Sequence, residues 1–82
     1  MKYPELARKA QIEGRVIVRF IVDGEGNVRD ASITRGLGDG CDEEAIRVLT
    51  EHAKFKPGIH QGEAVPVEMQ MPIVFKLGPD SA

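Results

Sequence analysis

The stretch GEAVPVEMQMPIVFKL, residues 62–77, alternates apolar and other side chains with a period of two. The odd positions from Val65 to Leu77 are all apolar, whereas most even positions carry proline, a charge or an amide. This alternation is typical of a β-strand that buries one face against a core. We therefore expect a long last strand over residues 64–77.

Two prolines, Pro66 and Pro72, occupy even positions of this strand. Because backbone N–H groups alternate in direction along a strand, both prolines lack a donor on the same lateral side. Proline within a sheet is confined to edges, so that side is most simply the free edge. A free edge can accept a strand from another chain. Alternatively, the prolines protect the edge against aggregation; the two roles are compatible, since the window between them stays usable.

Two further strands are expected upstream. Residues 15–22, RVIVRFIV, carry strong β-formers on both faces and no proline, which indicates the central strand of a sheet. The turn sequence DGEGN connects them to residues 28–35, VRDASITR, which read as a polar edge strand. The two segments form a hairpin.

Two helices complete the expected elements. Residues 3–12 form the first, with Pro4 at its first position and Gly14 ending it. The second runs from Asp42, a good N-cap, to about Lys54, where a proline turn stops it.

The element order α-β-β-α-β predicts an α+β fold. We expect a three-stranded antiparallel sheet in spatial order 2-1-3, with both helices on one face and the other face open. The chain is expected to be a single domain over residues 1–82, with its core within about 3–77 and a flexible tail at 78–82. The predicted core comprises Leu6, Val16, Val18, Phe20, Ile33, Ile46, Leu49, Val67, Met69 and Phe75.

Composition narrows the function classes. The chain has 82 residues, a net charge of −2 and 41% hydrophobic residues, which fits one small folded domain. No basic stripe stands out, so nucleic-acid binding is not expected. From this sequence we expect no membrane-spanning run and no signal peptide. The start of the chain fits either a small cytosolic protein or a domain excised from a longer chain.

Few residues are candidates for chemistry. Cys41 lies at an expected helix N-terminus, which would lower a thiol pKa, but His52 lies about 16 Å further along that helix. His60 adds no third partner, so we predict no catalytic residue, no metal site and no enzyme activity.

GLGDGC lacks the third glycine of a dinucleotide fingerprint, and DGEGNV lacks the glycine of a calcium loop, so no cofactor is expected. Cys41 is expected to pack partly inside.

Several motifs in order carry a family resemblance. YPELARKAQIEGRVIVRFIVDGEGNV, CDEEAIRVL, FKPG and PV…PIVFKL span residues 3–77, and this pattern resembles the C-terminal domain of the TonB energy-transducer family. The resemblance implies a periplasmic domain whose parent chain is anchored in the inner membrane. It also implies an ExbB/ExbD-type complex as partner of the parent's N-terminal part. The domain would grip the TonB box of an outer-membrane transporter as a β-strand added beside the last strand.

We therefore predict a non-enzymatic domain that binds a TonB-box peptide by strand addition and transmits energy for import. The alternative is a structural, dimerisation or anchoring module of a TonB-like signalling protein, in which the same edge pairs with a second copy of the chain. The predicted partner-binding residues lie along the edge strand and are Val65, Pro66, Val67, Glu68, Met69, Gln70, Met71, Pro72 and Val74.

Overall fold

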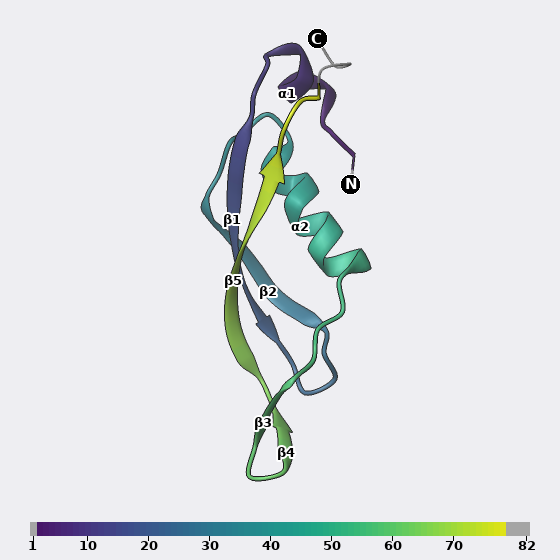
Figure 1. The fold of residues 1–82 in the computed structure, drawn as a ribbon, viewed down its shortest axis with the longest axis vertical. Helices are drawn as coiled ribbons and strands as arrows, with labels where there is room; N and C mark the ends of the chain where they lie inside the picture. The colour runs from purple at the N-terminus through teal and green to yellow at the C-terminus, as the bar shows by residue number, and fades with distance from the viewer. Residues whose placement is uncertain (1, 79–82) are drawn as a thin grey trace.

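The computed structural model describes residues 2–78, which form an elongated molecule of 51 × 22 × 15 Å (Figure 1). Its elements, in order, are α1 (Glu5–Lys9), β1 (Gly14–Val22), β2 (Val28–Arg35), α2 (Cys41–His52), β3 (Gly58–His60), β4 (Glu63–Val65) and β5 (Val67–Phe75). Of the predicted tail, residues 79–82 lie outside the described residues.

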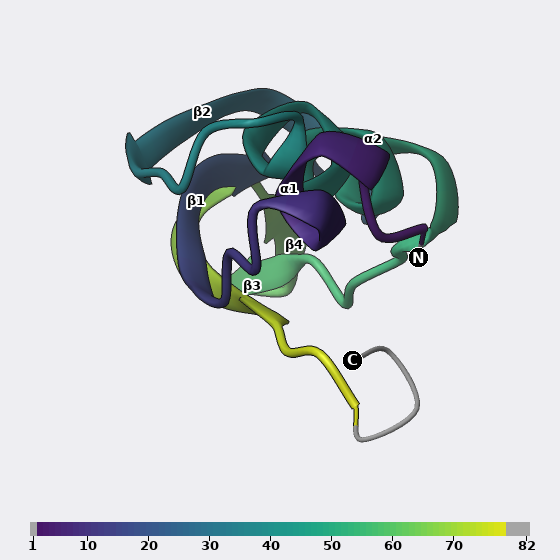
Figure 2. The same ribbon diagram turned by 90° about the horizontal axis from the view of Figure 1, so that it is seen from above.

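The main sheet has three antiparallel strands in the order β2-β1-β5. β1 is central, as its β-formers on both faces predicted. Both helices lie on the same face of this sheet (Figure 2). The α+β fold with spatial order 2-1-3 is therefore confirmed.

The core lies between β1 and the helices. The residues with at most 2% of their surface exposed are Ala7, Val16, Val18, Phe20, Val22, Cys41, Ala45, Leu49 and Phe75. The even positions of β1 supply the continuous row, because alternate side chains of a strand share a face. The predicted Ile33, Ile46, Val67 and Met69 are half-buried and pack against this cluster.

Helix α1 is shorter than predicted, and Leu6 is not a core residue. Pro4 is the extended N-cap, and Gln11, with φ of 60°, ends the helix three residues before Gly14. The N–H groups of Gln11 and Ile12 bond back to the last turn, which is a Schellman arrangement. A helix this short buries only Ala7, and Leu6 is 69% exposed.

Helix α2 begins one residue earlier than predicted, and Asp42 is not its N-cap. The N-cap is Gly40, whose φ of 88° is a left-handed conformation. Glycine adopts this conformation readily because it has no Cβ atom. The Asp42 carboxylate instead accepts hydrogen bonds from the N–H groups of Leu37 and Gly38, at 2.9 and 3.3 Å. Asp42 therefore orders the loop that leads into the helix.

The predicted last strand is divided. β4 pairs with β3 in a separate hairpin, and the chain then joins the main sheet as β5, which ends at Phe75. The break falls at Pro66, whose missing N–H suits a point where the strand changes partner. The hairpin turn is Gln61-Gly62, with φ of 51° and 81°, and the hairpin projects from the end of the molecule opposite α1 (Figure 1).

Candidate functional site

Strand β5 forms one edge of the main sheet. Its register with β1 is unbroken from Val67, opposite Val22, to Phe75, opposite Gly14. Within residues 2–78, no strand pairs with the other side of β5. The free edge that the prolines predicted is therefore present along β5.

A hydrogen bond on the opposite side of β1 fixes which backbone groups of β5 face this edge. The carbonyl of Ile17 accepts a 3.1 Å bond from the Thr34 hydroxyl on β2. Since the N–H and C=O of one strand residue point the same way, Ile17 directs its polar groups toward β2. Its partner on β5 is Pro72, so the Ile17–Pro72 pair is not hydrogen-bonded, and Pro72 faces the free edge.

Alternation along an unbroken register extends this result. Glu68, Gln70 and Val74 have the same parity as Pro72, so their N–H and C=O groups also face outward. An added strand would find donors at these three residues and a carbonyl, without a donor, at Pro72. The unbroken register also means that no bulge near Pro72 reverses the parity.

The opposite edge of the sheet, β2, is irregular. Its register with β1 shifts between Ile17 and Val18 and again between Arg19 and Ile21. Each shift places an extra residue on β2, and Asp30 within it has φ of 53°. Bulges of this kind disrupt an edge and block strand addition. β5 is thus the regular edge of the two.

The predicted partner-binding residues fall into three places. The residues from Val67 to Pro72, together with Val74, lie on β5. Val65 belongs to β4, where it pairs with Gly58, so it is not part of this edge. Pro66 lies between the two strands, outside either ladder.

Side chains of β5 divide between the two faces. Val67, Met69, Met71 and Ile73 are half-buried and pack against the core. Glu68, Gln70, Pro72 and Val74 are exposed on the open face. Glu68 forms an ion pair with Arg19 on β1, with 2.9 Å between Oε1 and the guanidinium, and both side chains are about half exposed.

The residues considered for chemistry are not assembled into a site. Cys41 is fully buried, more deeply than predicted, while His52 and His60 are exposed on α2 and β3. Burial, followed by the charges of Asp42 and Asp39, raises the pKa of the Cys41 thiol. Burial thus opposes the activation of this thiol that a helix N-terminus would favour. Among residues 2–78 there is no cluster of side chains that could hold a metal ion.

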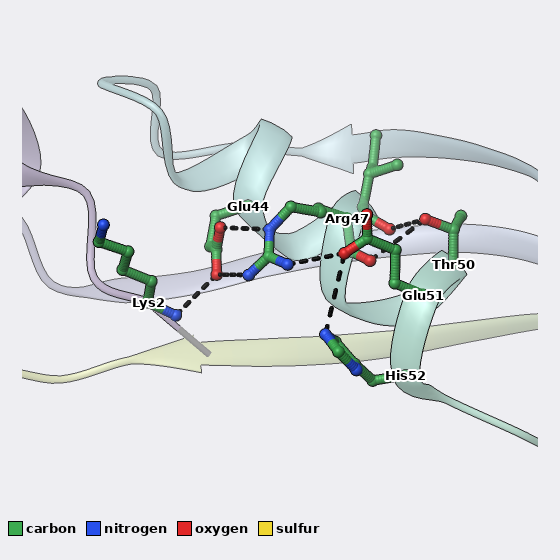
Figure 3. A network of polar contacts seen from close by, with 7 residues as sticks. Lys2, Glu44, Arg47, Thr50, Glu51 and His52 are labelled. Atoms are coloured by element: carbon green, nitrogen blue, oxygen red, sulfur yellow. Dashed lines mark hydrogen bonds and ion pairs between the residues drawn. The ribbon is translucent and has the colours of Figure 1, made fainter.

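A charged network that sequence reasoning missed ties the N-terminal segment to α2 (Figure 3). Arg47 bonds Glu44 and Glu51, each at 2.7 Å, and Glu44 also accepts a 2.7 Å bond from the backbone N–H of Lys2. Hydrogen bonding from Arg47 lowers the pKa of Glu44 to about 2. Helical spacing could have shown the Arg47–Glu51 pair, but the bond to Lys2 spans 42 residues.

No helix within residues 2–78 has the length and apolar character needed to cross a membrane.

Together, these observations define a class: an α+β domain with two helices on one face of a three-stranded antiparallel sheet and one regular edge unpaired. Within this class, the chain belongs to the family described as Gram-negative bacterial TonB protein C-terminal, whose model matches residues 1–77.

Two relatives support this membership. The chain is 32% identical over 77 residues to the protein TonB of Vibrio cholerae serotype O1. That match covers 93% of this chain and 31% of the Vibrio protein, so the chain spans about a third of that relative. The solution NMR structure of the Pseudomonas aeruginosa TonB CTD matches with a TM-score of 0.67 and 25% identity, over 93% of this chain and 77% of that one.

Family membership indicates the class of protein to which the chain belongs. TonB proteins are energy transducers and not enzymes, and the TonB C-terminal domain is periplasmic in Gram-negative bacteria. This chain therefore belongs to a family of energy transducers rather than of enzymes.

Proposed function

We propose that the chain binds the TonB box of an outer-membrane transporter as an extra strand on the free edge of β5. The observation that carries this proposal is the row of outward-facing backbone groups at Glu68, Gln70 and Val74, on the regular edge of the sheet. Backbone pairing supplies affinity in strand addition, and side chains beside the ladder supply specificity. The proposed partner is thus an extended peptide segment, and no cofactor takes part.

The domain would transmit energy for import through this ladder. Its parent chain would be anchored in the inner membrane and driven by an ExbB/ExbD-type complex. A pulling force on the partner strand would be shared among several backbone hydrogen bonds and passed from β5 to the central strand. The long β1–β5 pairing, from Val67 to Phe75, suits such a load.

The test is NMR shift mapping of the purified domain with a TonB-box peptide. We expect the largest amide shifts, and new protection from hydrogen exchange, at Glu68, Gln70 and Val74. Shifts confined to the hairpin at 23–27 or to the helices, with β5 silent, would contradict the proposal.

The same edge supports an alternative function, in which β5 pairs with β5 of a second copy. This self-association would make the chain a dimerisation or anchoring module. Sedimentation measurements across a range of concentrations distinguish the two. A monomer that binds the peptide supports transporter binding, whereas a dimer that the peptide does not dissociate supports the structural role.

A further inference from the structure

In the described part of the chain, the face of the sheet opposite the helices carries a paired charge at one end of β5 and an unpaired cation at the other. Near one end, the Glu68 carboxylate is already held by Arg19. At the other end, Arg15 lies on β1 opposite Val74, and within residues 2–78 no carboxylate lies at ion-pair distance from it. The second end therefore offers a cation that this part of the chain does not neutralise.

The surroundings of Arg15 strengthen this positive charge. Arg15, Val74 and Lys76 line one open hollow, in which Glu13 is the only acidic residue. Arg35 lines the neighbouring hollow with Arg15, on the side away from the edge. Three cations gather here although the whole chain has a net charge of −2.

The geometry of strand addition brings a partner side chain within reach of Arg15. Neighbouring strands lie about 4.8 Å apart, so an added strand would lie about 10 Å from the β1 backbone. The partner residue opposite Val74 shares its face of the sheet. Val74 is 55% exposed, and the aliphatic stem of Arg15 can extend over it while the guanidinium reaches the added strand.

We propose that the β5 edge selects an extended segment with an acidic residue opposite Val74, and that Arg15 recognises this residue. This inference rests on the proposed function. A planar guanidinium suits a carboxylate because it can donate two parallel hydrogen bonds. An acidic residue at the other end would instead meet Glu68, so the charge would also fix the register and direction of the partner strand.

The experiment starts from a TonB-box peptide, capped at both ends, in which every acidic residue is replaced by its amide. One aspartate is then returned at either the N-terminal or the C-terminal end of the box. We expect one of the two aspartate peptides to bind about two- to fivefold more tightly than the uncharged peptide, as an exposed ion pair would give, and to lose this gain at high salt. The favoured end reports the direction of the added strand.

Two variants identify the residue responsible. Arg15→Gln should abolish the gain while leaving binding of the uncharged peptide unchanged. Arg35→Gln is the matched control: this arginine lies on β2, opposite Ile17, about 14 Å from the added strand, so the gain should persist. Arg15→Glu should reverse the preference toward a lysine at the same peptide position.

Each other outcome has a definite meaning. Equal affinity for all three peptides would overturn the inference, and so would a gain in affinity that survives in Arg15→Gln. If the amides of β5 still shift in these experiments, the proposed strand addition remains supported. A gain lost equally in both glutamine variants would show general attraction to a basic surface and also overturn it. If no peptide shifts the amides of Glu68, Gln70 and Val74, the proposed function fails, and this inference fails with it.

Discussion

At the scale of single residues, two leucines show that position decides what a side chain contributes. Leu49 on α2 is 2% exposed and belongs to the core, whereas Leu6 on α1 is 69% exposed. The same truncation therefore has different costs. Leu49→Ala should lower the free energy of unfolding by about 2–5 kcal/mol, because it removes buried methyl groups and leaves a cavity. Leu6→Ala should change it by less than about 0.5 kcal/mol.

Urea unfolding of both variants checks this prediction. Equal losses would mean that Leu6 is buried in solution. For a domain of this size, the larger loss is a substantial part of the total stability, so the Leu49 variant should be measured at low temperature.

The Cys41 thiol gives a second prediction at this scale. Its side chain is fully buried and its pKa is raised, so the reactive thiolate is both scarce and inaccessible. We expect iodoacetamide at pH 8 to label the folded protein at least about a hundredfold more slowly than the urea-unfolded protein, because labelling needs an opening of the core. Mass spectrometry measures the extent of labelling over time. Rapid labelling of the folded protein would contradict the burial of Cys41 and would allow a chemical role for this residue.

At the scale of elements, the alternation of backbone groups along β5 makes neighbouring positions unequal. Gln70 directs its N–H to the free edge, whereas Met71, opposite Val18, directs its N–H to β1. Gln70→Pro should keep the stability within about 1 kcal/mol but weaken peptide binding about tenfold or more, since it removes a central donor and places a ring against the partner. Met71→Pro should instead destabilise the fold, because it breaks the internal ladder.

Thermal unfolding and peptide titration of the two proline variants measure both effects, and Gln70→Ala serves as the control for the loss of the side chain. If Gln70→Ala weakens binding as much as Gln70→Pro, the amide side chain rather than the backbone edge recognises the peptide. If Gln70→Pro unfolds the protein, the assigned direction of the N–H is wrong.

Elements with strong periodicity were predictable from sequence. The bounds of β2 were predicted correctly, and β1 and α2 differ from their predicted ranges by at most two residues. The free edge of β5 was also predicted. The side of the strand on which Pro72 lacks an N–H follows from the alternation of residues alone, and the register with β1 in the structure keeps that alternation.

Elements that depend on distant contacts were not predictable. The β3–β4 hairpin consists of two strands of three residues each, too short for a periodic pattern. The break at Pro66 depends on β4 pairing with β3 rather than with β1, which the alternation of 64–77 does not reveal. Asp42 has the residue type of an N-cap, but the backbone places Gly40 there and the carboxylate reaches back to the preceding loop.

At the scale of the whole molecule, two hydrogen bonds and one aromatic contact fix the N-terminal segment to the rest of the domain. The backbone N–H of Lys2 donates to Glu44 on α2, and the Tyr3 hydroxyl donates to the carbonyl of Ile12, just before β1. The Tyr3 ring also packs edge-on against Phe75 at the end of β5, with ring centroids 5.6 Å apart. In the proposed function, a force entering through this segment would thus reach both neighbouring strands and α2.

The Glu44 network makes this attachment dependent on pH. Hydrogen bonding from Arg47 lowers the pKa of Glu44 from 4.5 to about 2 in the folded protein. Because the folded pKa is the lower one, Glu44 stabilises the fold fully above pH 4.5, and this contribution declines as the pH falls toward 2. Glu44→Gln should therefore lower the melting temperature at pH 7, and its difference from the parent protein should shrink through that window.

Glu43→Gln is the matched control, since Glu43 is exposed on the adjacent position of α2 and forms no ion pair within residues 2–78. Its melting temperature should follow that of the parent protein from pH 7 to pH 2. The N-terminal attachment can be followed in the same samples through the protection of the Lys2 amide, taken as its exchange rate relative to the intrinsic rate at the same pH. This protection should be lower in Glu44→Gln than in the parent at pH 7, and in the parent it should fall only at acid pH. A Glu44→Gln protein whose melting temperature differs from that of the parent by the same amount at every pH would show that the contacts of Glu44 with Arg47 and Lys2 make no pH-dependent contribution to stability.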